Sequence, residues 1–273
     1  MKGGSATAVL LDAICLRSLL LAQKTAKTAH FLRPSDTAGL GESASIAQIC
    51  FAYQSVHGET YCSASQEDAL PACMRQAVAS LRAGGRLLYV GAASAGCMAF
   101  IDASEMPDTY GSPFDQIRGF VEGGWGVDGV GNASGDIAHV SALHHISYDH
   151  FREDILPTLC DKDTVVVVAH SESLTKHTLS LAEDIQHKSP VMVLGAVNKR
   201  LLSPTAAEVL TSLLHLCAKN TIISLSQEIE GLFDYSLKLV LNAVSTYAQV
   251  FVEYSLSYVN TILYIHCHVN LTI

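Results

Sequence analysis

The sequence predicts an α/β fold in which a doubly wound parallel sheet is flanked by helices, a three-layer αβα arrangement. Short aliphatic runs, of which TVVVVA at 164–169 is the clearest, fit strands buried on both faces. Longer segments with apolar residues at helical spacing alternate with these runs. The 273-residue chain is 49% hydrophobic and 16% charged, which is sufficient for a large core. In such folds ligands bind at the carboxyl ends of the strands.

The first part of the chain is predicted to be helical. Apolar residues recur at i, i+3 and i+4 from 5 to 24, and this spacing returns over 45–57 after a loop at 31–44 that contains proline and glycines. A second loop is expected at 58–65. The next helix, 66–83, should end at the glycine pair Gly84 and Gly85.

Strands and helices alternate in the rest of the chain. The strands are expected at 86–90, 116–121, 164–169, 191–194 and 221–225. The helices are expected from the glycine loop at 91–96 to about Glu105, and at 150–158, 174–187, 205–217 and 234–262. The glycine-rich segment 123–135 is interpreted as a surface insertion.

Composition excludes several classes of partner. The formal net charge is −9 and no run of Lys or Arg is present, so a nucleic-acid interface is not expected. The apolar stretch 237–265 is long enough for a bilayer, but polar residues such as Asn242, Gln249 and Glu253 interrupt it, and we interpret it as a buried helix rather than a membrane span. Eight scattered cysteines without C-x-x-C spacing indicate reduced thiols and a cytoplasmic or nuclear location.

The loop GAASAG at 91–96 is the first candidate binding element. It follows a predicted strand and precedes a helix, where small residues let backbone N–H groups approach an anion and Ser94 can add a hydroxyl. A structural turn that needs small residues explains the pattern equally well. No dinucleotide or Walker A motif supports a nucleotide.

The segment AHSES at 169–173 is the second candidate. Ser171 and Ser173 follow the most strand-like run and can bond a sugar or a phosphate. Either serine would also serve as a helix N-cap, and the residues leave both interpretations open.

Other chemistry has weak support. Glu105 is expected near the end of its helix, where a carboxylate opposes the helix dipole, and an ordinary surface glutamate is the simpler interpretation from sequence alone. No metal site is expected, because the closest histidines, His144 with His145 and His266 with His268, lack the spacing that places ligands on one helix face. Serine hydrolase chemistry lacks the G-x-S-x-G elbow.

Several segments together resemble a known family. YVGAAS at 89–94 followed by DASEMPDTYG at 102–111 is similar to a segment shared by bacterial N-acetylmuramic acid 6-phosphate etherases and the animal glucokinase regulatory proteins. The opening MKGGSAT resembles the motif that ends the first sugar-isomerase (SIS) domain of these proteins. FDQIRGF at 114–120, FREDILP at 151–157 and VLNAVST at 240–246 extend the resemblance over nearly the whole chain and favour the regulatory proteins.

The resemblance implies an SIS-type fold and a domain plan. Residues 1–65 would be a helical lead-in from a preceding SIS domain, 66–262 an SIS domain and 263–273 a tail, so that the chain represents a fragment or a shortened isoform of a longer protein. In this family two SIS domains and a helical cap enclose one fructose-phosphate site. Fructose 6-phosphate strengthens, and fructose 1-phosphate weakens, the inhibition of glucokinase.

The resemblance also implies roles for two residues. Glu105 would hydrogen-bond the sugar, and Lys238 would point its cation at the same ligand. The loop 91–96 departs from the Gly-Thr-Ser-Gly-Arg type sequence of the etherases, and the second acidic residue of their active site has no counterpart. Residues 221–236 are shorter and more polar than the hydrophobic segment through which the regulatory proteins contact glucokinase.

Three hypotheses follow. The first is a non-enzymatic, sugar-phosphate-responsive inhibitor of glucokinase that needs no cofactor. The second is a lyase or isomerase acting on amino-sugar phosphates, which requires a general base beside Glu105. The third is a structural SIS domain without a ligand.

Overall fold

The computed structural model describes residues 53, 56–60, 69–124, 145–171, 173–198, 200, 202–217, 219–224 and 230–253. They form a wholly parallel five-stranded sheet in the order β2-β1-β3-β4-β5. The strands are β1 (Leu87–Gly91), β2 (Ile117–Val121), β3 (Thr164–His170), β4 (Val191–Val197) and β5 (Lys219–Ser224). This order reverses direction at β1, so the topological switch point lies between the carboxyl ends of β1 and β3.

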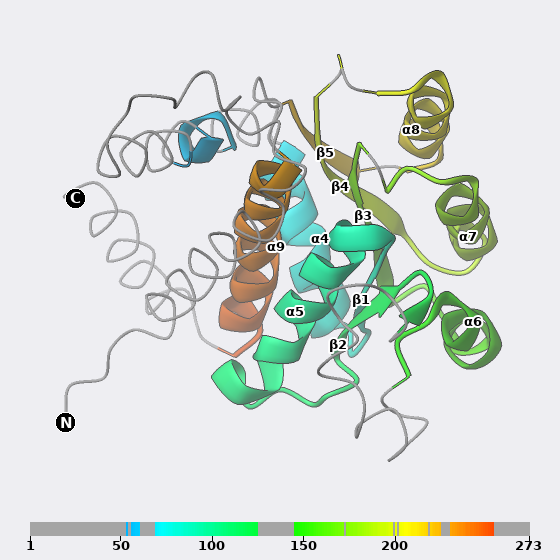
Figure 1. Ribbon diagram of the computed structural model, residues 1–273. Helices are drawn as coiled ribbons and strands as arrows, with labels where there is room; N and C mark the ends of the chain where they lie inside the picture. Colours follow the sequence, from blue (N-terminus) through cyan, green and yellow to red (C-terminus); the bar gives the residue numbers. More distant parts are fainter. Residues whose placement is uncertain are drawn as a thin grey trace.

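Helices cover both faces of the sheet, which confirms the predicted three layers (Figure 1). One face carries α4 (Ala69–Arg82), α5 (Ala93–Tyr110) and α9 (Glu230–Glu253). The other carries α6 (Tyr148–His150) with the π-helical turn η4 (Phe151–Ile155) and the 3₁₀ turn η5 (Leu156–Thr158), then α7 (Lys176–Gln186) and α8 (Pro204–Leu216). Each parallel strand pair is joined through a helical connection, as parallel sheets require.

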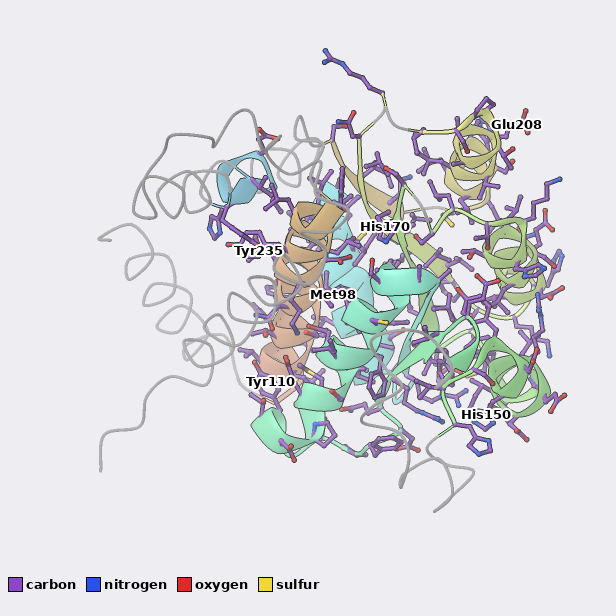
Figure 2. All side chains as sticks on the ribbon, viewed as in Figure 1. Met98, Tyr110, His150, His170, Glu208 and Tyr235 are labelled. Carbon is purple, nitrogen blue, oxygen red and sulfur yellow. The ribbon has the colours of Figure 1, made fainter. Side chains whose placement is uncertain are left out.

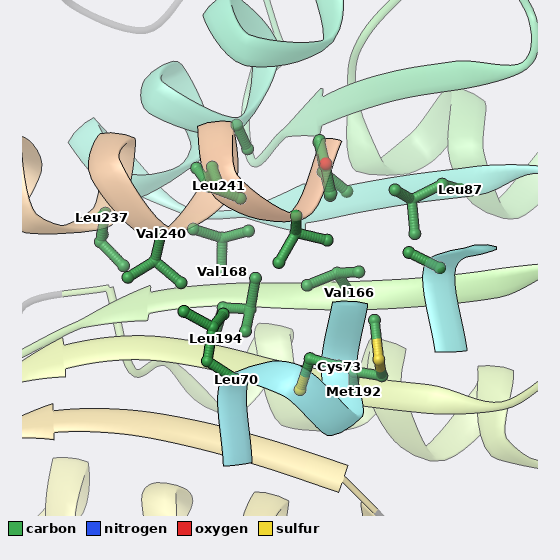
Figure 3. Close-up of a cluster of buried hydrophobic side chains, with 14 of the residues drawn as sticks. Leu70, Cys73, Leu87, Val166, Val168, Met192, Leu194, Leu237, Val240 and Leu241 are labelled. Carbon is green, nitrogen blue, oxygen red and sulfur yellow. The ribbon is translucent and has the colours of Figure 1, made fainter. Parts of the chain in front are cut away.

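The core has two halves, one on each face of the sheet. Strand side chains alternate between them: Val166 and Val168 pack toward α4 and α9, whereas Val165 and Val167 pack toward α7 and α8. Figure 3 shows the first half, in which Leu237, Val240 and Leu241 of α9 lie over the strands. Four of the five strands are completely buried, and their sequences are mainly apolar, although β2 includes the buried Arg118.

All five predicted strands are confirmed within a few residues, as are the helices predicted at 66–83, 174–187 and 205–217. The helix predicted at 150–158 begins at Tyr148 and passes through α, π and 3₁₀ turns. The helix predicted at 234–262 begins earlier, at Glu230, and is described as far as Glu253. The helix predicted at 5–24, the loop at 31–44 and nearly all of 45–57 lie outside the described residues, as does most of the insertion at 123–135.

Two local predictions are wrong. Residues 58–60 belong to a helical segment, 56–60, rather than to a loop, and the buried Thr60 bonds Ser236 of α9 at 2.7 Å. Helix α5 does not end near Glu105 but continues through Pro107 to Tyr110. Pro107 lacks an N–H, yet packing against β2 and α9 keeps the helix intact until Gly111, which adopts a left-handed conformation with φ of 67°.

Small residues bring α5 unusually close to the sheet. A methyl group added to Gly96 would lie 2.3 Å from the carbonyl oxygen of Gly91, and one added to Gly119 would lie 2.5 Å from Phe100 Cα. The glycines of the loop 91–96 are therefore required for packing, whatever else the loop does. None of the helices that the structure describes combines the length and the apolar composition needed to cross a membrane.

Candidate functional site

Three side chains meet at the switch point. Ser94, in the first turn of α5, lies beside His170 at the end of β3, with 2.7 Å between Ser94 Oγ and His170 Nε2. The same hydroxyl donates to Asp234 Oδ1 of α9 at 2.8 Å. His170 is buried, with 2% of its surface exposed, and Figure 2 labels it near the start of α5. We call Ser94, His170 and Asp234 the switch-point cluster.

The switch-point cluster is not a serine-hydrolase triad. In a triad the histidine lies between the serine and the carboxylate, whereas here Ser94 lies between His170 and Asp234. Because the single hydroxyl hydrogen of Ser94 goes to Asp234, His170 Nε2 must carry the hydrogen it shares with Ser94. The Asp234 carboxylate thus accepts from the Ser94 hydroxyl, which was expected to bind an anion. The negative charge of Asp234 disfavours a phosphate group beside Ser94.

The two serines after β3 have different environments. Ser173 is buried, accepts a hydrogen bond from His170 N at 2.7 Å and donates one to His170 O at 3.1 Å, so it closes the turn after the strand. The Ser171 hydroxyl is buried and has no hydrogen-bond partner within the described part of the chain. Neither serine caps α7, whose N-cap is Thr175. The N-cap interpretation of Ser171 and Ser173 is therefore wrong.

Glu105 and Lys238 meet in a second cluster, between α5 and α9. Lys238 Nζ lies 2.8 Å from Glu105 Oε2 and 2.8 Å from Asp102 Oδ1. The side chains of Lys238 and Asp102 are 3% and 0% exposed, whereas that of Glu105 is 22% exposed. Asp102 and Glu105 are three residues apart, which places both on one face of α5. We call Asp102, Glu105 and Lys238 the helix-pair cluster.

The helix-pair cluster shifts the pKa values of its members. Burial raises the pKa of Glu105, and the nearby Asp102 adds to this rise, while Lys238 acts in the opposite direction. For Lys238, burial would lower the pKa, but Asp102 and Glu105 outweigh it and hold the pKa above its ordinary value. Tyr89 of β1 is completely buried, and its phenol pKa is raised well above its usual value by burial and by Asp102. The lysine therefore stays charged, and Glu105 binds a proton more readily than an ordinary glutamate does.

The two clusters are too far apart to act as one small site. Ser94 and Glu105 are separated by eleven residues of α5, which corresponds to about 16 Å along the helix axis. The structure therefore brings Glu105 and Lys238 together and places Ser94, Ser171 and Ser173 elsewhere, at the carboxyl ends of β1 and β3. For all five of these residues, the role in ligand binding stays a prediction.

Three residues of these clusters were not predicted from the sequence: Asp102, His170 and Asp234. The D-x-x-E spacing of Asp102 and Glu105 was a usable signal, because residues at i and i+3 share a helix face. His170 belongs to the candidate segment 169–173, but nothing in the sequence distinguished it from the serines of that segment. The part of the chain that the structure describes contains no group of three or more His, Cys, Asp or Glu side chains able to hold a metal ion.

Comparison with known proteins gives one consistent result. A protein-family model described as "Glucokinase regulatory protein, second SIS domain" matches residues 63–252. The glucokinase regulatory protein of Rattus norvegicus is 29% identical over 259 residues, a match that covers 92% of this chain and 38% of that protein. The chain thus spans well under half the length of the curated relatives it matches.

A short match relates the chain to the etherases, and a match to a solved structure concerns the fold. The N-acetylmuramic acid 6-phosphate etherase of Symbiobacterium thermophilum is 57% identical over 44 residues, 16% of this chain and 15% of that enzyme. A solved structure of an E. coli CFT073 protein, determined as a complex, aligns with a TM-score of 0.50 at 10% identity, over 80% of this chain and 96% of that one. At this identity the structural likeness concerns the fold alone.

Proposed function

Since the chain belongs to the glucokinase regulatory protein family, with residues 63–252 corresponding to its second SIS domain, we propose that it is a sugar-phosphate-responsive regulator of glucokinase. In this proposal the chain is not an enzyme, and fructose 6-phosphate and fructose 1-phosphate are its ligands. They act by binding two states of the protein with different affinity, one of which inhibits the kinase. The proposed location is the cytoplasm and the nucleus.

The contact between Glu105 and Lys238 carries the proposal. Both residues were expected at the sugar from the family resemblance, and they lie 2.8 Å apart although 133 positions separate them in the sequence. Glu105 is the partly exposed member of the helix-pair cluster, so it is the one that a ligand can reach. Its carboxyl group can bond sugar hydroxyls, and the buried Lys238 fixes its orientation.

Calorimetric titration of the chain with fructose 6-phosphate and fructose 1-phosphate tests the proposal. We expect saturable binding, and we expect Glu105→Ala to weaken it about tenfold, the loss expected for one hydrogen bond. Glu105 is the better target than Lys238, because Glu105→Ala leaves Lys238 paired with Asp102, whereas removing Lys238 leaves two carboxylates in a buried site.

Asp108→Asn is the matched control, since Asp108 is an exposed acid on the same helix. It should bind like the wild type. A glucokinase assay with and without each ligand then tests inhibition. Equal affinity of the wild type and Glu105→Ala, or no inhibition of glucokinase at saturating fructose 6-phosphate, would contradict the proposal.

One observation favours an etherase-type lyase as the second candidate. The pKa of Glu105 is raised, as in a general acid, although Asp102, the other acid of the cluster, is completely buried and does not complete the pair of carboxylates that this chemistry uses. Turnover of N-acetylmuramic acid 6-phosphate that disappears in Glu105→Ala would support this candidate. Absence of turnover together with saturable binding would support the regulator.

A structural SIS domain without a ligand is the third possibility. It is supported if a folded chain gives no heat with either sugar phosphate and sediments or scatters light as a dimer. A monomer that binds neither ligand would count against it.

A further inference from the structure

A cavity of about 430 Å³ lies at the amino ends of β4 and β5, and the residues that line it belong to neither cluster. Ligands of doubly wound folds bind at the carboxyl ends of the strands, so this cavity is separate from the site described above. The start of β4 and the end of α8 give it an apolar wall, and its polar residues include Gln76, Asp161, Lys188, Ser189 and Lys219. Two lysines and one aspartate thus line it, a local excess of positive charge in a chain whose net charge is −9. We call it the amino-end cavity.

A chain of hydrogen bonds holds Lys219 at the amino-end cavity. Lys219 Nζ donates to Gln76 Oε1 at 3.0 Å, and Gln76 Nε2 donates to Thr164 Oγ1 at 3.1 Å. Thr164 Oγ1 lies 2.6 Å from Ser80 Oγ, which donates to the backbone carbonyl of Lys162 at 2.7 Å. Because an ammonium group only donates, the direction of every bond in this chain is fixed. Among the described residues the bond to Gln76 uses one of the three N–H groups of Lys219, and the other two can donate to a bound anion.

Ser189 adds a hydroxyl group without a partner to the same cavity. The residue is 5% exposed, and its Oγ is buried and has no hydrogen-bond partner within the described part of the chain. A buried polar atom without a partner costs free energy, which a bond to a ligand oxygen recovers. Lys188 alone would carry no argument, because the helix dipole favours a lysine just after the C-terminal end of α7. That dipole explains neither the unpartnered hydroxyl of Ser189 nor the anchored Lys219.

We propose that the amino-end cavity binds a phosphate group, with Lys188 and Lys219 as its cationic partners and the Ser189 hydroxyl as a further donor. A phosphate group has at least three oxygens for donors that come from three residues, whereas a carboxylate has two. Asp161 opposes binding, because its negative charge repels the anion. The inference is independent of the proposed function, since neither Glu105 nor Lys238 lines this cavity.

NMR titration of the ¹⁵N-labelled full chain with inorganic phosphate, at constant ionic strength, tests the proposal. We expect saturable shifts of the backbone amides of Lys188, Ser189 and Lys219. Lys219→Gln and Ser189→Ala should each weaken binding about tenfold, the loss expected for one hydrogen bond to a charged group. Asp161→Asn should strengthen binding about threefold, because it removes an exposed repulsive charge. Lys162→Gln is the matched control, since this exposed lysine does not line the cavity, and its affinity should stay within about twofold of the wild type.

Ser189→Ala separates a binding role from a structural one. Because the hydroxyl has no partner, the free energy of unfolding in phosphate-free buffer should not fall in this variant, although phosphate affinity does. Lys188→Gln changes an exposed side chain and keeps the test available should Lys219→Gln fail to fold, and it should weaken binding about threefold. The proposal is overturned by an absence of saturable shifts with phosphate. It is also overturned if Lys188→Gln and Ser189→Ala bind phosphate as tightly as Lys162→Gln.

The same titration with fructose 6-phosphate distinguishes the source of the phosphate group. Shifts at Ser189 and Lys219 in the Glu105→Ala chain would show that the amino-end cavity accepts a phosphate ester, and shifts with inorganic phosphate alone would show that it accepts the free anion. Failure of the proposed function would appear as an absence of shifts around Glu105 when fructose 6-phosphate is added to the wild type. That outcome would leave the result with inorganic phosphate unchanged.

Discussion

Asp163 links β1 and β3 at their amino ends, whereas the switch-point cluster lies at the carboxyl ends of the same strands. Its carboxylate accepts from Arg86 Nε and Nη2, from Arg86 N at 2.8 Å and from Cys160 N at 3.1 Å. Burial alone would raise the pKa of Asp163, but these hydrogen bonds outweigh it and lower the pKa. The residue directly precedes β3 and Arg86 directly precedes β1, so this pair fixes the central strands next to each other.

Asp163→Asn should therefore lower the free energy of unfolding by about 3 kcal/mol at neutral pH, since it breaks a buried ion pair. A lowered pKa means that the folded chain binds this proton less readily than the unfolded chain. The stabilisation is complete above about pH 4, the ordinary range of an aspartate, and is lost as the pH falls through the Asp163 pKa. Urea unfolding at pH 7 and near pH 3 measures it.

The exposed neighbour Asp161 supplies the control, because Asp161→Asn should leave the unfolding free energy nearly unchanged at both pH values. If Asp163→Asn destabilised the chain equally at pH 7 and pH 3, the ionic part of this interaction would be disproved.

At the scale of elements, helix α5 contributes residues to both the switch-point cluster and the helix-pair cluster. It begins at the loop after β1, supplies Ser94 to the switch-point cluster and supplies Asp102 and Glu105 to the helix-pair cluster. Gly91 and Gly96 let its first turn approach β1, and Gly119 of β2 lets its middle approach the sheet. The positions of both clusters therefore depend on close contact between one helix and two strands.

Gly96→Ala should destabilise the chain by about 3 kcal/mol or more, because the added methyl group meets backbone atoms of Gly91 that cannot move independently. Gly58→Ala is the matched control: a methyl group at Gly58 meets no atom within 4 Å, so stability should be unchanged or slightly higher. Thermal unfolding followed by circular dichroism compares the two. A Gly96→Ala chain as stable as the wild type would show that α5 is not held this close to the sheet.

The strands and most helices could be predicted because their patterns are local. The fully buried strand β3 contains the unbroken apolar run 165–169, and no tertiary information is needed to recognise it. The continuation of α5 through Pro107 could not be predicted, because packing against other elements overrides the local preference of proline to end a helix.

The helix-pair cluster was only partly predictable. Family resemblance indicated Glu105 and Lys238, but the contact of Asp102 with Lys238 depends on how α5 and α9 pack, which no local pattern contains. The same holds for Asp234, which joins the switch-point cluster from a helix that starts after the last strand.

At the scale of the whole molecule, one sheet separates two apolar half-cores. Leu241 of α9 and Leu213 of α8 are both completely buried and belong to different halves. The strands contribute to both, since alternate residues point to opposite faces. The two halves are therefore expected to unfold together.

Leu241→Ala and Leu213→Ala should each lower the free energy of unfolding by about 2–5 kcal/mol, the usual loss for a large-to-small change in a core. The double variant should show the sum of the two effects, because the two residues belong to different clusters on opposite faces of the sheet. Urea unfolding monitored by fluorescence and by circular dichroism measures both. Two separate transitions, or a double variant no less stable than the worse single variant, would show that the halves do not form one cooperative unit.

The wholly parallel order of the strands also determines how the chain reaches this state. All neighbouring pairs among the described strands are parallel, so none of these pairs forms through a hairpin, and the pairing of Leu87 with Thr164 requires that the whole intervening segment has been synthesised. Such non-local pairing slows folding and leaves strand edges open to other chains while it is incomplete. Ser94 meets His170 only when β3 has docked beside β1, so recovery of the switch-point cluster during refolding reports the docking of these two strands.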